Sequence, residues 1–196
     1  LYIYFEPHQE DSDPPPTKVN ILAPGDITIT HIDQMNYLTS KKTDFSVDFK
    51  ICSKVTGYFK HMKGLSEELM TAMGSFSSDQ CTNYSTGEED MQRCNKSVSI
   101  NISAGTVIGH AGGDNETQYN FDWGLRDTRI ERLDFINQSA FYDDWYYIVC
   151  ALDYYDEPLK SQLKNKLGYD DGSGLEARTI EPICGENAQD IPNTLK

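Results

Sequence analysis

Hydrophobic and polar residues alternate in short runs along much of the chain, and glycine separates many of these runs. The clearest run covers residues 44–52, where Phe45, Val47, Phe49 and Ile51 alternate with polar residues. Successive side chains of a strand point to opposite faces, so this period of two predicts a half-buried strand. Other runs predict strands at residues 1–5, 26–32, 54–61, 98–102, 106–110, 119–126 and 145–150.

The same alternation predicts where two histidines point. It places His31 on the face that carries Ile29, and it places His61 on the face that carries Phe59. Residues two apart in a regular strand share a face. We therefore expect both histidines to follow the apolar side chains of their strands.

Two segments break the alternation and predict short helices. Leu65 to Met73 has Ser66 in the N-cap position and Gly74 in the C′ position. In residues 158–167, leucine recurs every four residues, which predicts a second helix. Residues 75–97 show no periodicity, and we expect an insertion loop there.

Many short strands with glycine between them predict a mainly β fold, an antiparallel sandwich or barrel with two short helices. The 196 residues are enough for one domain with a sizeable core. We expect this domain to span residues 1–150, including the loop at 75–97. Residues 151–196 are expected to form a disulfide-bracketed C-terminal extension packed on it.

The charge of the chain excludes some classes of partner. Its formal net charge is −14 at pH 7, which disfavours binding to nucleic acid and to anionic membranes. No run approaches the roughly 18 apolar residues of a membrane-spanning helix. We therefore expect neither a nucleic-acid partner nor a membrane span.

Asparagine followed at the second position by serine or threonine occurs more often than composition predicts. Chance gives roughly two such N-glycosylation motifs. The chain has them at Asn83, Asn95, Asn101, Asn115 and Asn137. This excess predicts a secreted, extracellular glycoprotein, and unmodified polar surface loops are the alternative. Asn83 and Asn115 lie in polar, turn-like segments, where we expect glycans first.

The five cysteines have no spacing typical of a structural zinc site. Cys81 and Cys94 bracket the polar segment, and Cys150 and Cys184 bracket the C-terminal helical segment. Two disulfides formed in an oxidising compartment fit this layout. Cys52 is then either a buried thiol or paired outside this chain, and five cysteines allow several other connectivities.

Four segments follow one another in a recurring order. Residues 22–29 join an Ala-Pro-Gly turn to an alternating strand, and residues 58–65 form a strand with a histidine near its end. Residues 103–113 form a glycine-rich hairpin, which leads to the strand that contains residues 120–123. In order and spacing these segments resemble the lysostaphin-type zinc endopeptidases. The resemblance covers about residues 19–127 and implies a compact antiparallel β-fold of the duplicated-hybrid-motif kind.

The resemblance also implies a site, and this chain departs from it. His61 occupies a catalytic position of the family. Asn120 stands where the family has the first histidine of a His-x-His pair, and an amide does not exchange protons near pH 7. Asp122 stands in place of the second histidine, and a carboxylate can still ligate zinc. We expect Asn120 and Asp122 to share a side of their strand and His61 to approach them.

The family's two earlier zinc ligands, a histidine and an aspartate, belong before residues 22–29. The only such set in this chain is His8 with Asp11 or Asp13, in a proline-rich stretch that fits the family position poorly. The counterparts could also precede Leu1. With these ligands in doubt, we expect no bound cofactor or metal and no peptidase activity.

Three hypotheses follow for the function. The first is a secreted, glycosylated pseudoenzyme that serves as a binding or structural module and contacts a cell-surface or cell-wall component. The second is a zinc-dependent endopeptidase whose missing ligands lie upstream of residue 1 or are supplied by His8 and a nearby aspartate. The third is a subunit of an extracellular assembly, whose partners are other protein subunits.

Overall fold

The computed structural model describes residues 2–4, 18–112, 120–133 and 143–164. The chain divides into two compact units, Tyr2–Trp123 and a second that comprises Leu1 and Gly124–Lys196. The domain boundary at residue 150 stays a prediction.

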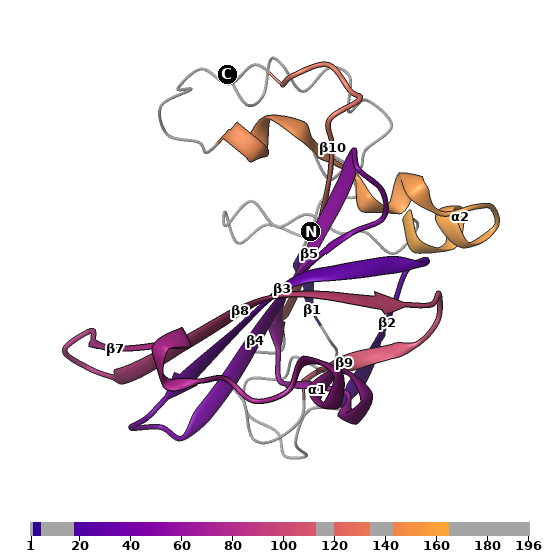
Figure 1. The fold of residues 1–196 in the computed structure, drawn as a ribbon. Coiled ribbons are helices and arrows are strands. Elements are labelled where there is room, and N and C mark those ends of the chain that lie inside the picture. Colours follow the sequence, from indigo (N-terminus) through magenta and orange to yellow (C-terminus); the bar gives the residue numbers. More distant parts are fainter. Residues whose placement is uncertain (1, 5–17, 113–119, 134–142, 165–196) are drawn as a thin grey trace, which may run out of the picture. The chain divides into compact units, whose positions relative to one another are not determined.

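The fold is mainly β, as predicted, and its described strands form two sandwich-like antiparallel sheets rather than a closed barrel. The main path of the large sheet runs in the order β1, β10, β5, β4, β3, β8 and β7 (Figure 1). Its strands are β1 (Tyr2–Tyr4), β10 (Asn120–Asp127), β5 (Val55–Met62), β4 (Lys42–Lys50), β3 (Ile27–Tyr37), β8 (Asp90–Ile102) and β7 (Cys81–Ser85). The small sheet contains β2 (Val19–Leu22), β9 (Val107–Ala111) and β6 (Gly64–Leu65).

Aromatic side chains form the centre of the first unit. The ring of Phe59 lies 4.8 Å from that of Phe49 and 5.6 Å from that of Phe121, measured between ring centroids. Trp123 packs on Phe59 from the next inward position of β10, with 6.4 Å between the ring centroids. These rings come from β4, β5 and β10, so the alternation of three separate strands builds one core.

The predicted orientation of both histidines is wrong, because each lies at an irregularity in its strand. The register of β3 shifts between Ile29 and His31, and Ile32 rather than His31 is buried. In β5, His61 has a φ of 60°, and the next residue, Met62, is buried in its place. An extra residue in one strand of a pair moves the alternation by one position, which a regular period of two does not foresee.

The first predicted helix is confirmed as α1 (Glu67–Met73). The Oγ of Ser66 accepts a hydrogen bond from the backbone N–H of Leu69 at 3.2 Å, as expected for an N-cap. Gly74 ends the helix with a φ of 66°, a conformation that glycine adopts without steric cost. Leu69 is fully buried and anchors the helix.

Residues 75–97 are not the unpatterned loop that the sequence predicts. They contain a 3₁₀ turn at Ser78–Gln80, all of β7 and the first half of β8. The inward positions of this half of β8 include Gln92, Cys94 and Lys96, so no hydrophobic alternation marks the strand. Polar side chains occupy the places where apolar residues normally reveal a strand.

The described part of the second unit is mostly helical. It includes 3₁₀ helices at Asp143–Tyr147 and Ala151–Tyr154, the two-residue strand β11 (Ile148–Val149) and α2 (Leu159–Lys164). The strand predicted at residues 145–150 is therefore wrong except for β11. α2 confirms the start of the second predicted helix, and its predicted end lies outside the described residues. No helix in the described ranges is long and apolar enough to cross a membrane.

Candidate functional site

The disulfide predicted between Cys81 and Cys94 is confirmed. The two cysteines are directly opposite each other on β7 and β8, with their Cα atoms 4.0 Å apart. Cys150 also takes part in a disulfide, and Cys184, its predicted partner, lies outside the described residues. Cys52 is exposed rather than buried.

A groove lies beside the Cys81–Cys94 disulfide, between the inner face of β7–β8 and the chain that runs from α1 to the 3₁₀ turn. It consists of two adjoining hollows of about 580 and 520 Å³, which share Phe76, Cys81 and Gln92. The remaining lining residues of this groove are Gln34, Phe45, Met70, Thr71, Met73, Gly74, Ser75, Ser77, Ser78, Asn83 and Cys94. The lining therefore mixes apolar side chains with amides and hydroxyls.

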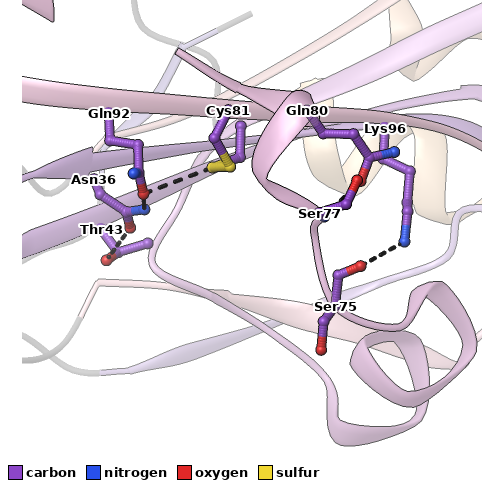
Figure 2. The surroundings of a disulfide bond; sticks show 9 residues. Asn36, Thr43, Ser75, Ser77, Gln80, Cys81, Gln92 and Lys96 are labelled. Atoms are coloured by element: carbon purple, nitrogen blue, oxygen red, sulfur yellow. Dashed lines mark hydrogen bonds between the residues drawn. A yellow bond between two sulfur atoms is a disulfide. The ribbon is translucent and has the colours of Figure 1, made fainter. Parts of the chain in front are cut away.

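Lys96 fixes one wall of the groove. Its Nζ donates a hydrogen bond to the backbone carbonyl of Met73 at 2.8 Å. It donates a second to the backbone carbonyl of Ser75, also at 2.8 Å (Figure 2). A cation at the C-terminal end of a helix interacts favourably with the exposed carbonyls and with the helix dipole. The wall continues at Ser77, whose backbone N–H donates to the side chain of Gln80 at 3.0 Å.

A row of polar side chains fixes the floor of the groove. Thr43 donates its hydroxyl to Asn36 at 3.0 Å, and Asn36 donates its amide to the Oε1 of Gln92 at 3.2 Å (Figure 2). The same Oε1 lies 3.7 Å from the Sγ of Cys94. A disulfide sulfur carries no proton, so this is a van der Waals contact and not a hydrogen bond. Gln92 is thus oriented by Asn36.

Two other amides on the groove are available to a ligand. The side chains of Gln34 and Asn83 line the groove, and within the described part of the chain they make no hydrogen bond to the protein. None of the lining residues has a side chain that exchanges protons near neutral pH. This lining suits binding through hydrogen bonds and apolar contact, and it offers no general acid or base.

The residues implied by the family resemblance lie elsewhere, and His61 contacts a residue that the sequence did not single out. Its Nδ1 lies 3.0 Å from the Oδ2 of Asp44, and the Nζ of Lys63 lies 3.9 Å from the same oxygen. The other oxygen of Asp44 is buried and, among the described residues, has no hydrogen-bond partner. The alternation of β4 gives no signal for this pairing, because it depends on the irregular backbone at His61.

Asn120 and Asp122 lie two residues apart on β10, where they pair with Tyr4 and Tyr2 of β1. Asp122 is buried, with 7% of its surface exposed. Their predicted approach to His61 stays a prediction.

The described residues do not fit a catalytic zinc site. Such a site needs about three protein ligands. No three histidine, cysteine, aspartate or glutamate side chains within the described ranges lie close enough together to hold a metal ion. His8, Asp11 and Asp13 lie outside those ranges, so the ligand set that they would complete stays a prediction.

The most strongly perturbed ionisable groups belong to the second unit. Arg129 donates to both carboxylate oxygens of Asp127, and the hydroxyl of Tyr154 donates to Oδ2 at 2.6 Å. The bonds from Arg129 hold the pKa of the buried Asp127 carboxylate well below its usual range. Burial, together with the bond to Asp127, raises the pKa of Tyr154 to about 12. These saturated contacts indicate a structural ion pair.

Three of the five predicted glycosylation positions lie in the described residues, and all three are exposed. Asn95 and Asn101 belong to β8, where they alternate with the inward residues and therefore lie on the outer face. Asn83 belongs to β7 and lines the groove, so its predicted turn-like setting is wrong. Asn115 and Asn137 lie outside the described residues.

Comparison with protein-family models, with curated proteins and with solved structures finds no match for the chain.

Proposed function

We propose that this chain is an extracellular, N-glycosylated module that binds a cell-surface or cell-wall component without catalysing a reaction. The observation that carries the proposal is the groove beside the Cys81–Cys94 disulfide. Its walls are fixed by a crosslink and by hydrogen bonds, and its lining offers unpaired amides with no proton-exchanging group. Fixed polar groups on a partly apolar surface are typical of binding sites.

Two further features support an extracellular setting. Disulfides persist in oxidising compartments, and this one crosslinks two neighbouring strands. Asn83, Asn95 and Asn101 are exposed and therefore accessible to a glycosylating enzyme.

We further propose, from the resemblance to lysostaphin-type peptidases, that this module derives from an enzyme of that kind. In it, Asn120 and Asp122 replace the two histidines of the family motif, so the module would be a pseudoenzyme. The alternative, a zinc-dependent endopeptidase, requires ligands outside the described residues.

The test compares two lysines introduced two residues apart on α1, on opposite sides of the helix. Met70 lines the groove and is 49% exposed, whereas Ala72 is exposed and does not line it. Binding of the labelled chain to intact cells and to purified cell-wall fragments is measured for Met70→Lys and for Ala72→Lys. We expect Met70→Lys to weaken binding at least about tenfold, since it places a charge and bulk in the groove. Ala72→Lys, which adds the same charge, should bind like the unaltered chain.

Two results would contradict the proposal. One is the absence of binding by the unaltered chain to any of these surfaces. The other is metal-dependent release of cell-wall peptides that Asp122→Ala abolishes, which would establish the endopeptidase.

A further inference from the structure

The strand β7 has one open edge, and the register shows which backbone groups face it. In an antiparallel pair, residues whose Cα atoms come within about 4.5 Å direct their N–H and C=O groups away from each other. Cys81 and Cys94 form such a pair, at 4.0 Å. Two residues along, Asn83 and Gln92 form another, so the N–H and C=O of Asn83 point away from β8.

No strand covers this edge in the described part of the chain. β7 ends the order of the large sheet. Apart from bonds within the sheet, the described backbone provides no partner for the N–H or C=O of Asn83. A second strand could therefore pair with β7 through Asn83 and Ser85, as in complexes that form by strand addition.

β7 also lacks the features that usually protect an edge strand. Natural edges carry lysine, proline or inward-pointing charges, which prevent pairing with other chains. β7 reads Cys-Thr-Asn-Tyr-Ser, with no charge and no proline, and its last four residues are exposed.

The charges at the two ends of β7 select the kind of strand that fits. Asp79 precedes the strand, and Glu88 and Asp90 follow it across the turn, all of them exposed. In a symmetric pair of two copies centred on Asn83, Asp79 of one copy would lie opposite Gly87 of the other and next to its Glu88, and like charges close together across a strand pair are destabilising. With the net charge of −14, this arrangement favours a partner with basic residues at both ends of a short uncharged core.

The groove lies on the same side as the open edge. Asn83 contributes to both, and Phe76 and Cys81 also line the second hollow. A strand that paired with β7 would direct every second side chain over this hollow, because strand side chains alternate. The edge would supply backbone hydrogen bonds to the partner strand, and the hollow would select which of its side chains fit.

We propose that the ligand of this module is a protein segment in extended conformation, with an uncharged core between basic residues, which adds to β7 as a further strand. This inference rests on the proposed binding function and names its partner class.

The test selects peptides from a random 12-residue library displayed on phage. The target is the full chain, produced in an oxidising compartment without N-glycosylation. We expect enrichment of peptides with lysine or arginine on both sides of an uncharged, β-branched core. A synthetic copy of an enriched peptide should lose binding when its core amides are N-methylated, since methylation removes the donors of a strand pair.

Variants of the chain measure separately how the open edge of β7 and the acidic residues at its ends contribute to binding. Asn83→Pro removes the N–H donor that faces the open edge but breaks no hydrogen bond to β8. We therefore expect this variant to keep the sheet and to lose binding. Thr82→Ala, at a position whose own N–H and C=O face β8, keeps the N–H of Asn83 and should bind normally. Asp79→Lys with Glu88→Lys should weaken binding about tenfold, whereas Glu131→Lys, on the second unit, should leave it unchanged.

Several outcomes would overturn the inference. They are no enriched peptide, enriched peptides that bind Asn83→Pro equally well, and binding that survives N-methylation of the core. A concentration-dependent dimer that Asn83→Pro dissociates would identify a second copy as the occupant instead. If cell-surface binding persists in Asn83→Pro, strand addition is wrong but the proposed function stands. Absence of surface binding by the unaltered chain contradicts the proposed function itself.

Discussion

The two ends of the large sheet in the first unit are stabilised in different ways. At one end, Phe59 stacks between Phe49 and Phe121, and burial of aromatic surface dominates. At the other end, the inward residues of β8 include Gln92 and Lys96, and order depends on a disulfide and on individual hydrogen bonds. A sheet can therefore extend beyond its core when specific bonds replace burial. The extended part then keeps polar surface for a ligand.

The largest expected effect belongs to the aromatic end. Phe59→Ala should lower the free energy of unfolding by about 3–5 kcal/mol, because Phe59 is 2% exposed and contacts three other rings. Denaturant titration of the purified chain measures this change. The matched variant Phe76→Ala, at the groove, should cost well under half as much. Equal losses would show that the two ends share one core.

Loss of the disulfide should have the next largest effect. Cys81→Ala with Cys94→Ala removes a crosslink over a sequence separation of 13 and should cost about 2–3 kcal/mol. Hydrogen exchange should accelerate in β7 and in residues 74–80 while the amides of β5 stay protected. Uniform acceleration through the whole unit would contradict the division between the two ends.

Replacing Lys96 should have a smaller effect on the same end. Lys96→Met keeps most of the apolar stem but leaves the carbonyls of Met73 and Ser75 without their donor, at a cost of about 1–3 kcal/mol. Lys50→Met, at an exposed position at the end of β4, serves as the control and should change stability by less than about 0.5 kcal/mol. Thermal unfolding of both variants distinguishes a specific contact from a general loss of charge.

Glycosylation should affect binding more than stability, and only on one face of the sheet. In a glycosylating host, Ser85→Ala prevents a glycan at Asn83 beside the groove, so ligand binding should strengthen a few-fold. Ser97→Ala prevents a glycan at Asn95 on the outer face and should leave binding unchanged. Intact mass establishes which positions are modified. Equal responses of the two variants would mean that the groove is not the binding site.

The sequence predicts the features that depend on local pattern. Ser66 and Gly74 delimit α1, the apolar alternation of residues 44–52 gives β4, and the positions of Cys81 and Cys94 give their disulfide. The groove itself is not predictable in this way. Its floor is a strand whose inward side chains are polar, and these become recognisable only when α1 lies across from them.

The interaction between His61 and Asp44 escapes the sequence for a different reason. It depends on backbone geometry at one residue and on a partner 17 positions away. A period of two carries no information about either, so Asp44 could be placed on a face but not beside a particular histidine.

The irregular backbone at His61 gives β5 one residue more than the stretch of β4 that it pairs with. Phe59 and Met62 both point inward although they are three residues apart, because the extra residue shifts the alternation by one position. Deleting His61 would leave Phe59 and Met62 two residues apart, the spacing at which regular strand residues share a face, so Met62 would still point inward. Natural variants of this chain should therefore keep the core intact either when His61 is lost or when it is exchanged for glycine or asparagine, which adopt its positive φ with little strain.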